Sequence, residues 1–416
     1  MKGRSFDIAI IGAGASGLCA AVAAARCFAR EGRSSSGIAL LEALPRVGKK
    51  LLATGNGRCN LTNSKITEDC YFENGAFALN VMRAADHEAV LAFFSSLGLR
   101  TKEDECGRVY PQSNQAASVL DALRFAVEKH GVCVLTETKA LSLKTHGNGF
   151  FINDSLFAKR VIVAAGGQSA RQFGSDGSGF ALLRELGVRL RPPFPALTGL
   201  LLGKPYPRAL KGVRAECEAR VCLGERVLAQ DTGEVQFNEN GVSGIPVMQI
   251  SRFASMYAGD KSLVLQIDRL PGMAAGELQA YLQARAREYP FLAAEDLMSG
   301  LMPKRLASVC VKEAGLSPSS SVSALQQADL ERIAACVKGQ TYTIEKTAGF
   351  DASQVTAGGV DTSEFCPQTL EIKKIKGLYC CGEVVNVDGL CGGFNLQWAW
   401  SSGLVSGTAA AQSLLE

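Results

Sequence analysis

The chain has 416 residues, with 44 Lys and Arg against 40 Asp and Glu, which gives a formal net charge of +4. Such a near balance creates no strong field for nucleic acid or for an acidic membrane, so we expect a small-molecule partner, no nucleic acid and no membrane. The length corresponds to about three units of roughly 150 residues each, enough for large buried cores. Oligomeric state is left open by these features.

Cysteine and histidine usage argues against a disulfide framework and against a zinc site. The 14 cysteines are scattered through apolar stretches, no C-x-x-C occurs and only three histidines are present, so we expect reduced thiols and no metal. The apolar run at 6–11 is too short to span a membrane, and no signal-type cleavage site follows it. We therefore expect a cytoplasmic protein.

The first 190 residues have the pattern of an α/β domain. A buried strand at 6–11, an alanine-rich helix at 16–30 and a second strand at 38–41 form a βαβ unit. Helices are predicted around 77–97 and 114–130, short strands at 132–136, 140–144 and 149–153, and a buried strand at 160–165. This alternation predicts a doubly wound, Rossmann-type sheet.

The pattern changes at Arg191, where three prolines in four positions end the helical pattern and predict a domain boundary. Residues 191–270 are predicted to be β-rich and residues 271–342 helical. Strand and glycine patterns return at 356–360 and 377–381, and a final helix begins near Phe394. We therefore predict a discontinuous domain of residues 1–190 and 343–416, interrupted by a substrate-side module at 191–342.

A glycine-rich turn follows the first strand. Gly12, Gly14 and Gly17 form G-x-G-x-x-G at the start of a helix, where glycine permits close approach to a pyrophosphate and the helix N-terminus offers free N–H groups. Glu42 ends the second strand, where an acid binds ribose hydroxyls. The interval from these glycines to Glu42 exceeds the usual ~20 residues, and the loop at 32–37 can absorb the extra residues. The competing interpretation is an ordinary α/β turn.

Two further glycine clusters have the composition of cofactor-binding loops. The segment 48–63 combines two lysines, which suit a pyrophosphate, with glycines and amides, which suit a flat ring with polar edges; the alternative is a surface loop. Near the C-terminus, a strand ends in Gly382-Glu383, and Asp388 precedes a double glycine that opens a helix. That arrangement suits a ribityl chain and a ring carbonyl, but it is also found in plain strand–turn–helix segments.

Read together, the three clusters resemble the BaiN/YhiN-type NAD(P)/FAD-dependent oxidoreductases, also called aminoacetone-oxidase-like flavoproteins. The most specific segments are Lys50-Leu51-Leu52-Ala53-Thr54-Gly55-Asn56-Gly57-Arg58-Cys59-Asn60-Leu61-Thr62-Asn63 and Gly392-Gly393-Phe394-Asn395-Leu396-Gln397-Trp398-Ala399-Trp400. The resemblance covers nearly the whole chain. It implies an FAD-binding domain of the doubly wound type, with an inserted β-barrel-like piece and a small helical piece.

The resemblance also implies which residues bind FAD. The ADP half would be held by Gly12, Ala13, Gly14, Ala15, Ser16, Gly17 and Glu42, with the backbone of Ala140 at the adenine and Ala165 and Gly166 at the closing strand turn. The pyrophosphate and ring would lie along Gly48, Lys49, Lys50, Asn56, Gly57, Arg58, Cys59 and Asn60. The ribityl and ring contacts would be completed by Gly382, Glu383, Asp388, Gly393, Phe394, Asn395 and Leu396.

The function that follows is hydride transfer through FAD between NAD(P)H and a small organic substrate. Alternatives are an oxidase of a small amine that uses oxygen, an RNA-modifying flavoprotein and a flavin sensor without turnover. No catalytic acid or base is assigned, because this chain has Asn238 and Glu239 where many family members carry Thr-His or Thr-Asp. Arg58 and Asn60 are candidates for positioning an anionic substrate or the flavin N5 edge.

Several tempting residues receive structural interpretations. Ser243 is predicted to cap a helix. Cys59 and Cys391 are interpreted as small residues beside the ring, not as a redox pair, and Trp398 and Trp400 as packing residues.

Overall fold

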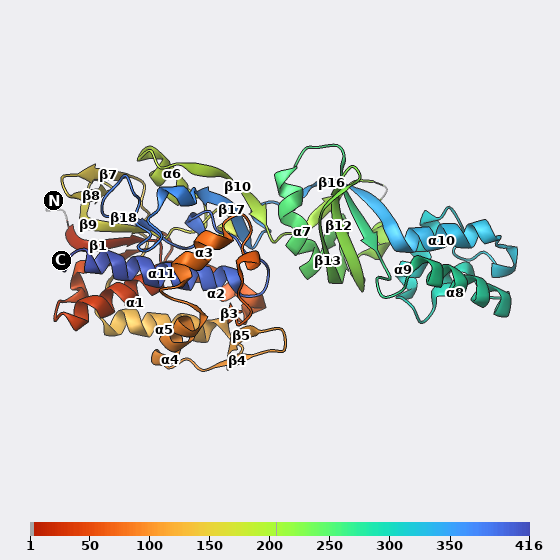
Figure 1. The fold of residues 1–416 in the computed structure, drawn as a ribbon, viewed down its shortest axis with the longest axis horizontal. Helices are drawn as coiled ribbons and strands as arrows, with labels where there is room; N and C mark the ends of the chain where they lie inside the picture. The colour runs from red at the N-terminus through yellow and green to blue at the C-terminus, as the bar shows by residue number, and fades with distance from the viewer. Residues whose placement is uncertain (1–3, 205) are drawn as a thin grey trace. The chain divides into compact units, whose positions relative to one another are not determined.

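The computed structural model describes residues 4–204 and 206–416, so the first three residues of the predicted domain lie outside the described residues. The chain divides into two compact units, one made of Met1–Phe194 with Val355–Glu416 and the other of Pro195–Gln354 (Figure 1). Each unit has apolar cores of its own. Each is therefore described by itself.

The first unit is built on a seven-stranded sheet in the order β6-β2-β1-β9-β8-β7, with β18 also pairing with β9. The pairs among β6, β2, β1, β9 and β18 are parallel, and β7 and β8 form an antiparallel extension. The strands are β1 Arg4–Ile11, β2 Ile38–Leu41, β6 Cys133–Leu135, β7 Leu143–His146, β8 Gly149–Ile152, β9 Leu156–Val163 and β18 Leu378–Cys380.

Both faces of β2, β18 and residues 8–11 of β1 are buried, as a sheet covered on both sides requires. Ile8 and Ile10 of β1 belong to one apolar cluster, whereas Ala9 and Ile11 belong to the other. The adjacent Cys380 and Cys381 also divide between these two clusters, because successive side chains of a strand point to opposite faces. All 14 cysteines are free.

The helices of the first unit pack on this sheet and on one another. They are α1 Ala15–Arg30, α2 Lys49–Ala53, α3 Gly75–Met82, α4 His87–Ser96, α5 Ala116–Lys129, α6 Ser178–Glu185 and α11 Phe394–Gln412. Helices α1 and α11 lie side by side (Figure 1), although they come from opposite ends of the sequence. Their backbones approach closely because Gly403 and Gly407 face α1, where a Cβ at either position would come within 2.4 Å of a main-chain oxygen.

Two small sheets complete the first unit. The first consists of β3 Thr62–Asn63, β5 Arg108–Pro111 and β4 Thr101–Glu103. The second pairs β10 Leu190–Ala196 with β17 Val355–Val360, and so joins the segments through which the chain leaves and re-enters the unit. The proline-rich segment after Arg191 is thus part of a strand, an edge position that proline tolerates because it needs no ladder N–H.

The second unit contains a closed barrel in the order β11-β14-β13-β12-β15-β16, and its strand pairs are antiparallel. The strands are β11 Leu200–Leu202, β12 Arg214–Leu223, β13 Arg226–Phe237, β14 Gly241–Ser243, β15 Leu263–Asp268 and β16 Gln340–Thr347. Helix α7 Ile245–Met256 packs on the barrel, and a separate apolar cluster joins α8 Ala275–Glu288, α9 Lys304–Glu313 and α10 Gln327–Gly339.

Two details differ from the sequence predictions. The second unit extends to Gln354, whereas the predicted module ended at 342, because β16 pairs with β11 and β15 and closes the barrel. Ser243 was predicted to be a helix cap, and this is wrong. It lies in β14, and its hydroxyl accepts a hydrogen bond from Asn238 (3.0 Å), while Gly244, at φ 104°, occupies the N-cap position of α7 without any side-chain cap.

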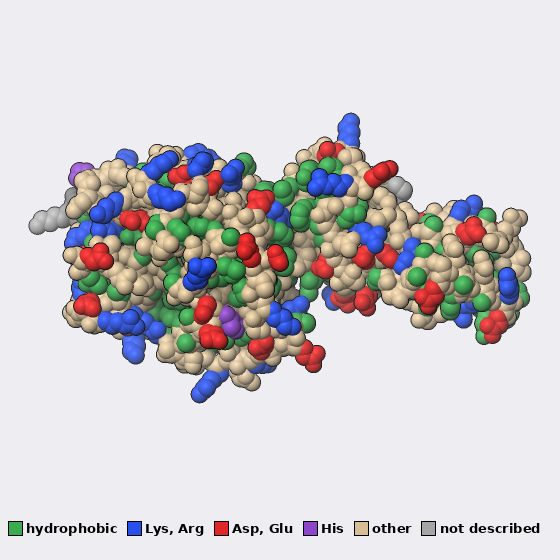
Figure 2. Space-filling view, viewed as in Figure 1, with side chains coloured by type: hydrophobic (Ala, Val, Ile, Leu, Met, Phe, Trp, Pro, Cys, Tyr) green, Lys and Arg blue, Asp and Glu red, His purple; other side chains and the backbone are tan. Residues whose placement is uncertain are grey.

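Charges of both signs are interspersed on the faces of the two units visible in Figure 2. This distribution matches the near balance of the sequence. None of the helices in the described part of the chain is both long and apolar enough to cross a membrane.

Candidate functional site

The turn after β1 leaves a stretch of backbone open. A Cβ at Gly12 would lie 2.5 Å from the carbonyl oxygen of Ala164, and one at Gly17 would lie 1.9 Å from the oxygen of Gly12, so both glycines are needed for packing. At Gly14 a Cβ would meet nothing within 4 Å. Gly14 is also the N-cap of α1, with no side-chain cap on the helix. An open backbone at a helix N-terminus is the geometry that binds a pyrophosphate.

Glu42 is held at the same turn by main-chain donors. Its Oε2 accepts from the N–H of Ala13 (3.1 Å) and its Oε1 from the N–H of Leu44 (2.9 Å). Each carboxylate oxygen can accept a further hydrogen bond, so the group remains able to bind hydroxyls. The main-chain oxygen of Glu42 accepts from Thr138 (2.8 Å), which ties this end of β2 to the segment that leads to the buried Ala140.

Helix α2 begins beside the same turn, because the N–H of Gly48 donates to the oxygen of Ala13 (2.9 Å). Lys50 on this helix forms an ion pair with Glu383 (2.6 Å), so the structure joins the second and third predicted clusters. The other oxygen of Glu383 accepts from the N–H of Thr356 in β17 (2.7 Å). Thr356 was missed by the sequence predictions, because nothing in the pattern of a short buried strand marks one threonine as a partner of a distant carboxylate.

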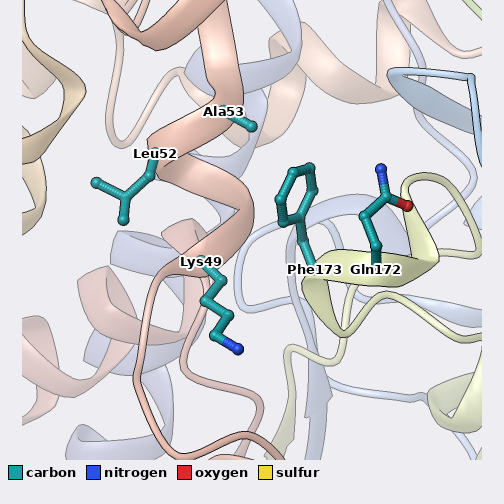
Figure 3. Close-up of a pocket in the computed structure, with 5 residues that line it drawn as sticks. All are labelled: Lys49, Leu52, Ala53, Gln172 and Phe173. Atoms are coloured by element: carbon teal, nitrogen blue, oxygen red, sulfur yellow. The ribbon is translucent and has the colours of Figure 1, made fainter.

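An open recess of about 400 Å³ lies against α2 (Figure 3). Lys49, Leu52 and Ala53 line it from the helix, and Gln172 and Phe173 line it from the short turn at 171–173. Its walls combine an aromatic ring and aliphatic carbons with one ammonium and one amide, a lining that suits a flat ligand with polar edges. Gln172 and Phe173 were not predicted, although they follow the predicted Ala165-Gly166 turn by only a few residues.

The loop after α2 has an unusual backbone. Gly55, Asn56, Gly57 and Cys59 all have positive φ values, and a two-residue left-handed stretch at 55–56 turns the chain sharply. Asn56, Gly57 and Arg58 are exposed. The guanidinium of Arg58 lies over the ring of Tyr110, 5.2 Å from its centre. The loop thus presents one cation and an amide at the surface of the first unit.

Cys59 differs from its exposed neighbours. The side chain is fully buried, and burial raises the pKa of its thiol to about 12, with a hydrogen bond to Thr54 opposing the shift. The thiol is therefore neutral across the physiological range and is a poor nucleophile. Cys59 is thus a small buried residue, and its position beside the ring stays a prediction.

The C-terminal cluster uses most of its side chains to hold its own loop. Asn395 accepts from the N–H of Gly389 (2.9 Å) and donates to the oxygen of the same residue (2.8 Å). The ring of Phe394 is buried against Tyr71, and Leu396 packs against the core. The main-chain N–H groups of Phe394, Asn395 and Leu396 begin α11 after Gly393 at φ 104° and have no acceptor within the helix, so a ligand could accept from them.

The two tryptophans are buried and join the loops to the core. Trp398 donates to the oxygen of Gly382 (3.0 Å), and Trp400 donates to the oxygen of Leu61 (2.8 Å). They therefore hold the third and second clusters respectively, as the packing interpretation predicted. Asp388 is buried in the same region.

A hydrogen-bonded chain of side chains supports this end of the site and was not predicted. The hydroxyl of Thr62 donates to Gln397 (2.5 Å) and lies 3.1 Å from Nδ1 of His87, and Gln397 donates to Ser401 (2.9 Å). Sequence could not reveal it, because its members come from β3, α4 and α11. Among the described residues, no group of three His, Cys, Asp or Glu side chains has an arrangement that could hold a metal ion.

The parallel sheet, the open glycine turn with its carboxylate and the lysine-containing helix α2 define a Rossmann-type dinucleotide-binding protein. Comparison with known proteins gives the family and the class of enzyme. The chain belongs to the family described as the HI0933-like protein Rossmann domain, whose family model matches residues 6–409. It is a flavin-dependent oxidoreductase, and the resemblance drawn from the three clusters is confirmed.

Two curated relatives match over nearly their whole length. One is the 3-dehydro-bile acid delta(4,6)-reductase of Clostridium scindens, 42% identical over 97% of this chain and 99% of that protein. The other is the ribosomal RNA dihydrouridine synthase of Escherichia coli, 27% identical over 99% of this chain and 98% of that protein. The two names denote enzymes that act on different substrates.

Solved structures show the same fold at low identity. The 3-ketosteroid delta1-dehydrogenase of Sterolibacterium denitrificans has a TM-score of 0.54 at 14% identity, covering 99% of this chain and all of that chain. A flavocytochrome c3 fumarate reductase has a TM-score of 0.50 at 16% identity, covering 99% of this chain and 79% of that chain. These likenesses concern the fold alone.

Proposed function

We propose that this protein uses FAD to transfer hydride from NAD(P)H to a carbon–carbon double bond conjugated to a carbonyl group in a small apolar substrate. The observation that carries the proposal is the 42% identity, over nearly the whole of both chains, to a reductase named for 3-dehydro-bile acids. That name describes a 3-oxo substrate with double bonds at positions 4 and 6. A conjugated carbonyl makes such a bond an acceptor for hydride.

The second relative supports the same type of reaction. Dihydrouridine differs from uridine by a saturated carbon–carbon bond, and that bond in uridine is also conjugated to a carbonyl. The two relatives thus differ in the size of their substrates, but both reduce a carbon–carbon double bond that is conjugated to a carbonyl group. A small substrate is favoured here by the higher identity to the bile-acid enzyme and by the near balance of charge. RNA binding usually depends on a basic surface.

The residues of the first unit fit FAD. The open backbone at Gly14 would bind the pyrophosphate, Glu42 would accept from the ribose hydroxyls, and Lys49 would balance the phosphate charge, whereas Lys50 is paired with Glu383. The start of α11 would favour negative charge on a bound ring, an effect of about 0.3–1 kcal/mol at an exposed site and more where water is excluded. When bound, FAD supplies the hydride chemistry.

The fold of the second unit bears on how NAD(P)H would reach the flavin. A dedicated nicotinamide domain would add a second parallel βαβ unit with its own glycine turn, but the described part of the second unit has an antiparallel barrel and helices, and residues 191–342 contain no G-x-G-x-x-G. NAD(P)H and substrate would then use the same opening in turn. Initial-rate plots against both should give parallel lines, whereas intersecting lines would indicate two simultaneous sites.

The direct test of the proposed function is to reduce the purified protein and offer it different acceptors. NADH and NADPH are added separately under argon, and loss of the oxidised flavin spectrum is recorded. The reduced protein is then mixed with a 3-oxo-4-ene steroid, with ribosomal RNA or with air. Reoxidation by the steroid supports the proposal, and reoxidation by RNA would move it to the dihydrouridine type. Reduction by a small amine, with oxygen as the acceptor, would show an amine oxidase instead.

A further inference from the structure

A buried acceptor in the loop after α2 has no hydrogen-bond partner among the described residues. The Oδ1 atom of Asn60 is buried from solvent and accepts no hydrogen bond from any described residue. A buried acceptor without a donor is costly and rare in native proteins. Because Asn60 belongs to the loop that fits FAD, a bound ligand is the natural source of the donor.

The surroundings of this atom narrow the choice of donor. Asn60 Oδ1 lies beside Gly393, where a Cβ would come within 2.9 Å of it. Gly393 precedes α11, a helix of 19 residues whose first N–H groups have no acceptor within the helix. One side-chain acceptor therefore adjoins several main-chain donors. A ligand that satisfies both must present a donor directly next to an acceptor.

The pyrimidine edge of a flavin has this pattern. Its C2 carbonyl accepts, the adjacent N3–H donates, and N3–H is the only N–H group of the oxidised ring. We propose that Asn60 accepts the N3–H of the flavin ring, while the start of α11 donates to the neighbouring C2 carbonyl. Asn60 is then a recognition residue for the ring, distinct from the residues that hold the ADP half. The inference rests on flavin binding and does not depend on the proposed substrate.

Strand β3, which follows this loop, contains a matched control. Asn63 is also an asparagine beside the double glycine, but both ends of its amide are used within the protein. Its Oδ1 accepts from the N–H of Lys65 (2.9 Å), and its Nδ2 donates to the oxygen of Gly392 (2.9 Å). Replacement of Asn63 therefore disturbs the loop without removing an acceptor for the ring. Any effect specific to N3–H should appear at Asn60 alone.

The test compares FAD with N3-methyl-FAD, which lacks the donor. Dissociation constants are measured by fluorescence titration of the apoprotein, without any substrate. The unaltered protein should bind FAD about tenfold or more tightly than N3-methyl-FAD. Asn60→Ala should reduce this preference to about twofold or less, because its acceptor is gone, and Asn63→Ala should retain the full preference.

Two results would overturn the assignment. One is an unaltered protein that binds both cofactors equally, a result that needs no variant to fold. The other is an Asn60→Ala protein that keeps the full preference for FAD. The midpoint potential gives an independent readout, because N3–H is present in both the oxidised and the reduced ring. Asn60→Ala should leave the potential unchanged, and a lower potential would instead place Asn60 at N5–H, which exists only after reduction.

Discussion

The two ends of the predicted FAD site use different parts of the chain. At the ADP end, Gly14 leaves the backbone open, and Glu42 is a charged side chain held ready by two main-chain donors. At the ring end, the polar groups of Asn395 and Trp398 form hydrogen bonds to neighbouring loops. The unpartnered acceptor of Asn60 and the first main-chain N–H groups of α11 remain for a ligand there, beside the exposed Asn56 and Arg58.

This difference teaches that a motif rich in polar residues is not necessarily a set of polar contacts to the ligand. A dinucleotide turn works through the absence of side chains, which lets a pyrophosphate approach the backbone. The ring end must first be stabilised, because its loop has positive φ values at Gly55, Asn56, Gly57 and Cys59. The predictions below are arranged by the size of the effect that would separate the two ends.

The largest effect is expected at Gly14. Its φ of −82° is allowed for any residue, and a Cβ there would meet no described atom within 4 Å, so Gly14→Val should fold. The branched side chain would fill the place of the pyrophosphate, so the protein should purify colourless instead of yellow with about one FAD per chain. Thermal unfolding and the visible spectrum measure the two properties separately. A Gly14→Val protein with its full complement of FAD would remove the ADP site from this turn.

A second variant distinguishes binding from folding at the same turn. Gly17→Val would place carbon atoms against the oxygen of Gly12, 1.9 Å from the position of a Cβ. We therefore expect Gly17→Val to lose stability as well as flavin, by about 1–3 kcal/mol or more for overpacking against the main chain, measured by thermal unfolding.

Removal of the second unit should separate binding from turnover. Residues 195–354 have cores of their own, and the chain enters and leaves through the paired strands β10 and β17. Replacing this segment by a short linker should leave FAD bound to the first unit and abolish reduction of the substrate. The check is a spectrum together with a turnover assay. Normal turnover in the shortened protein would show that the second unit has no part in the reaction.

A smaller effect is expected at Glu42. Hydrogen bonds to a charged group contribute roughly 1.5–3 kcal/mol, so Glu42→Ala should weaken FAD binding about 10- to 100-fold. Titration of the apoprotein gives the dissociation constant of FAD. Because Glu42→Gln keeps an acceptor, its dissociation constant should lie between those of the unaltered protein and Glu42→Ala. An unchanged constant for Glu42→Ala would mean that the ribose is bound elsewhere.

The smallest effect is expected at Cys59. With a pKa of about 12, only about one thiol in ten thousand is ionised near pH 8, so iodoacetamide should label the exposed Cys106 far faster. The thiolate fraction rises only as pH approaches the raised pKa, and Cys59→Ala should give the same pH–rate profile as the unaltered protein between about pH 6 and pH 10. A missing alkaline limb in the variant would give Cys59 a chemical role. Mass spectrometry of labelled peptides and the pH profile measure these outcomes.

Local patterns predicted much of the first unit. The strand at 38–41, the glycine turn and the helix that starts at Phe394 are visible in hydrophobic periodicity and glycine spacing, and the structure has them at those positions. These features depend on residues close in sequence. The barrel was predicted as a β-rich piece, but its last strand, β16, was assigned partly to the helical piece, because its partner β11 lies far away along the chain.

Contacts between distant segments could not be predicted in the same way. The ion pair of Lys50 and Glu383 joins residues that are 333 positions apart. The partners of Thr62, which lies in β3, come from α4 and α11. The unpaired acceptor of Asn60 is likewise visible only when every neighbour has been placed. The Ser243 prediction failed for a local reason, since Gly244 can adopt a positive φ that places the helix start one residue later.

The measurement that tests the central claim most directly is a single turnover without oxygen. The protein is reduced with one equivalent of NAD(P)H and mixed with a 3-oxo-4-ene steroid, while the flavin spectrum is followed and the product is analysed by mass spectrometry. The account predicts full return of the oxidised flavin and one equivalent of a product heavier by two hydrogen atoms. Flavin that stays reduced until air is admitted, with the steroid unchanged, would contradict it.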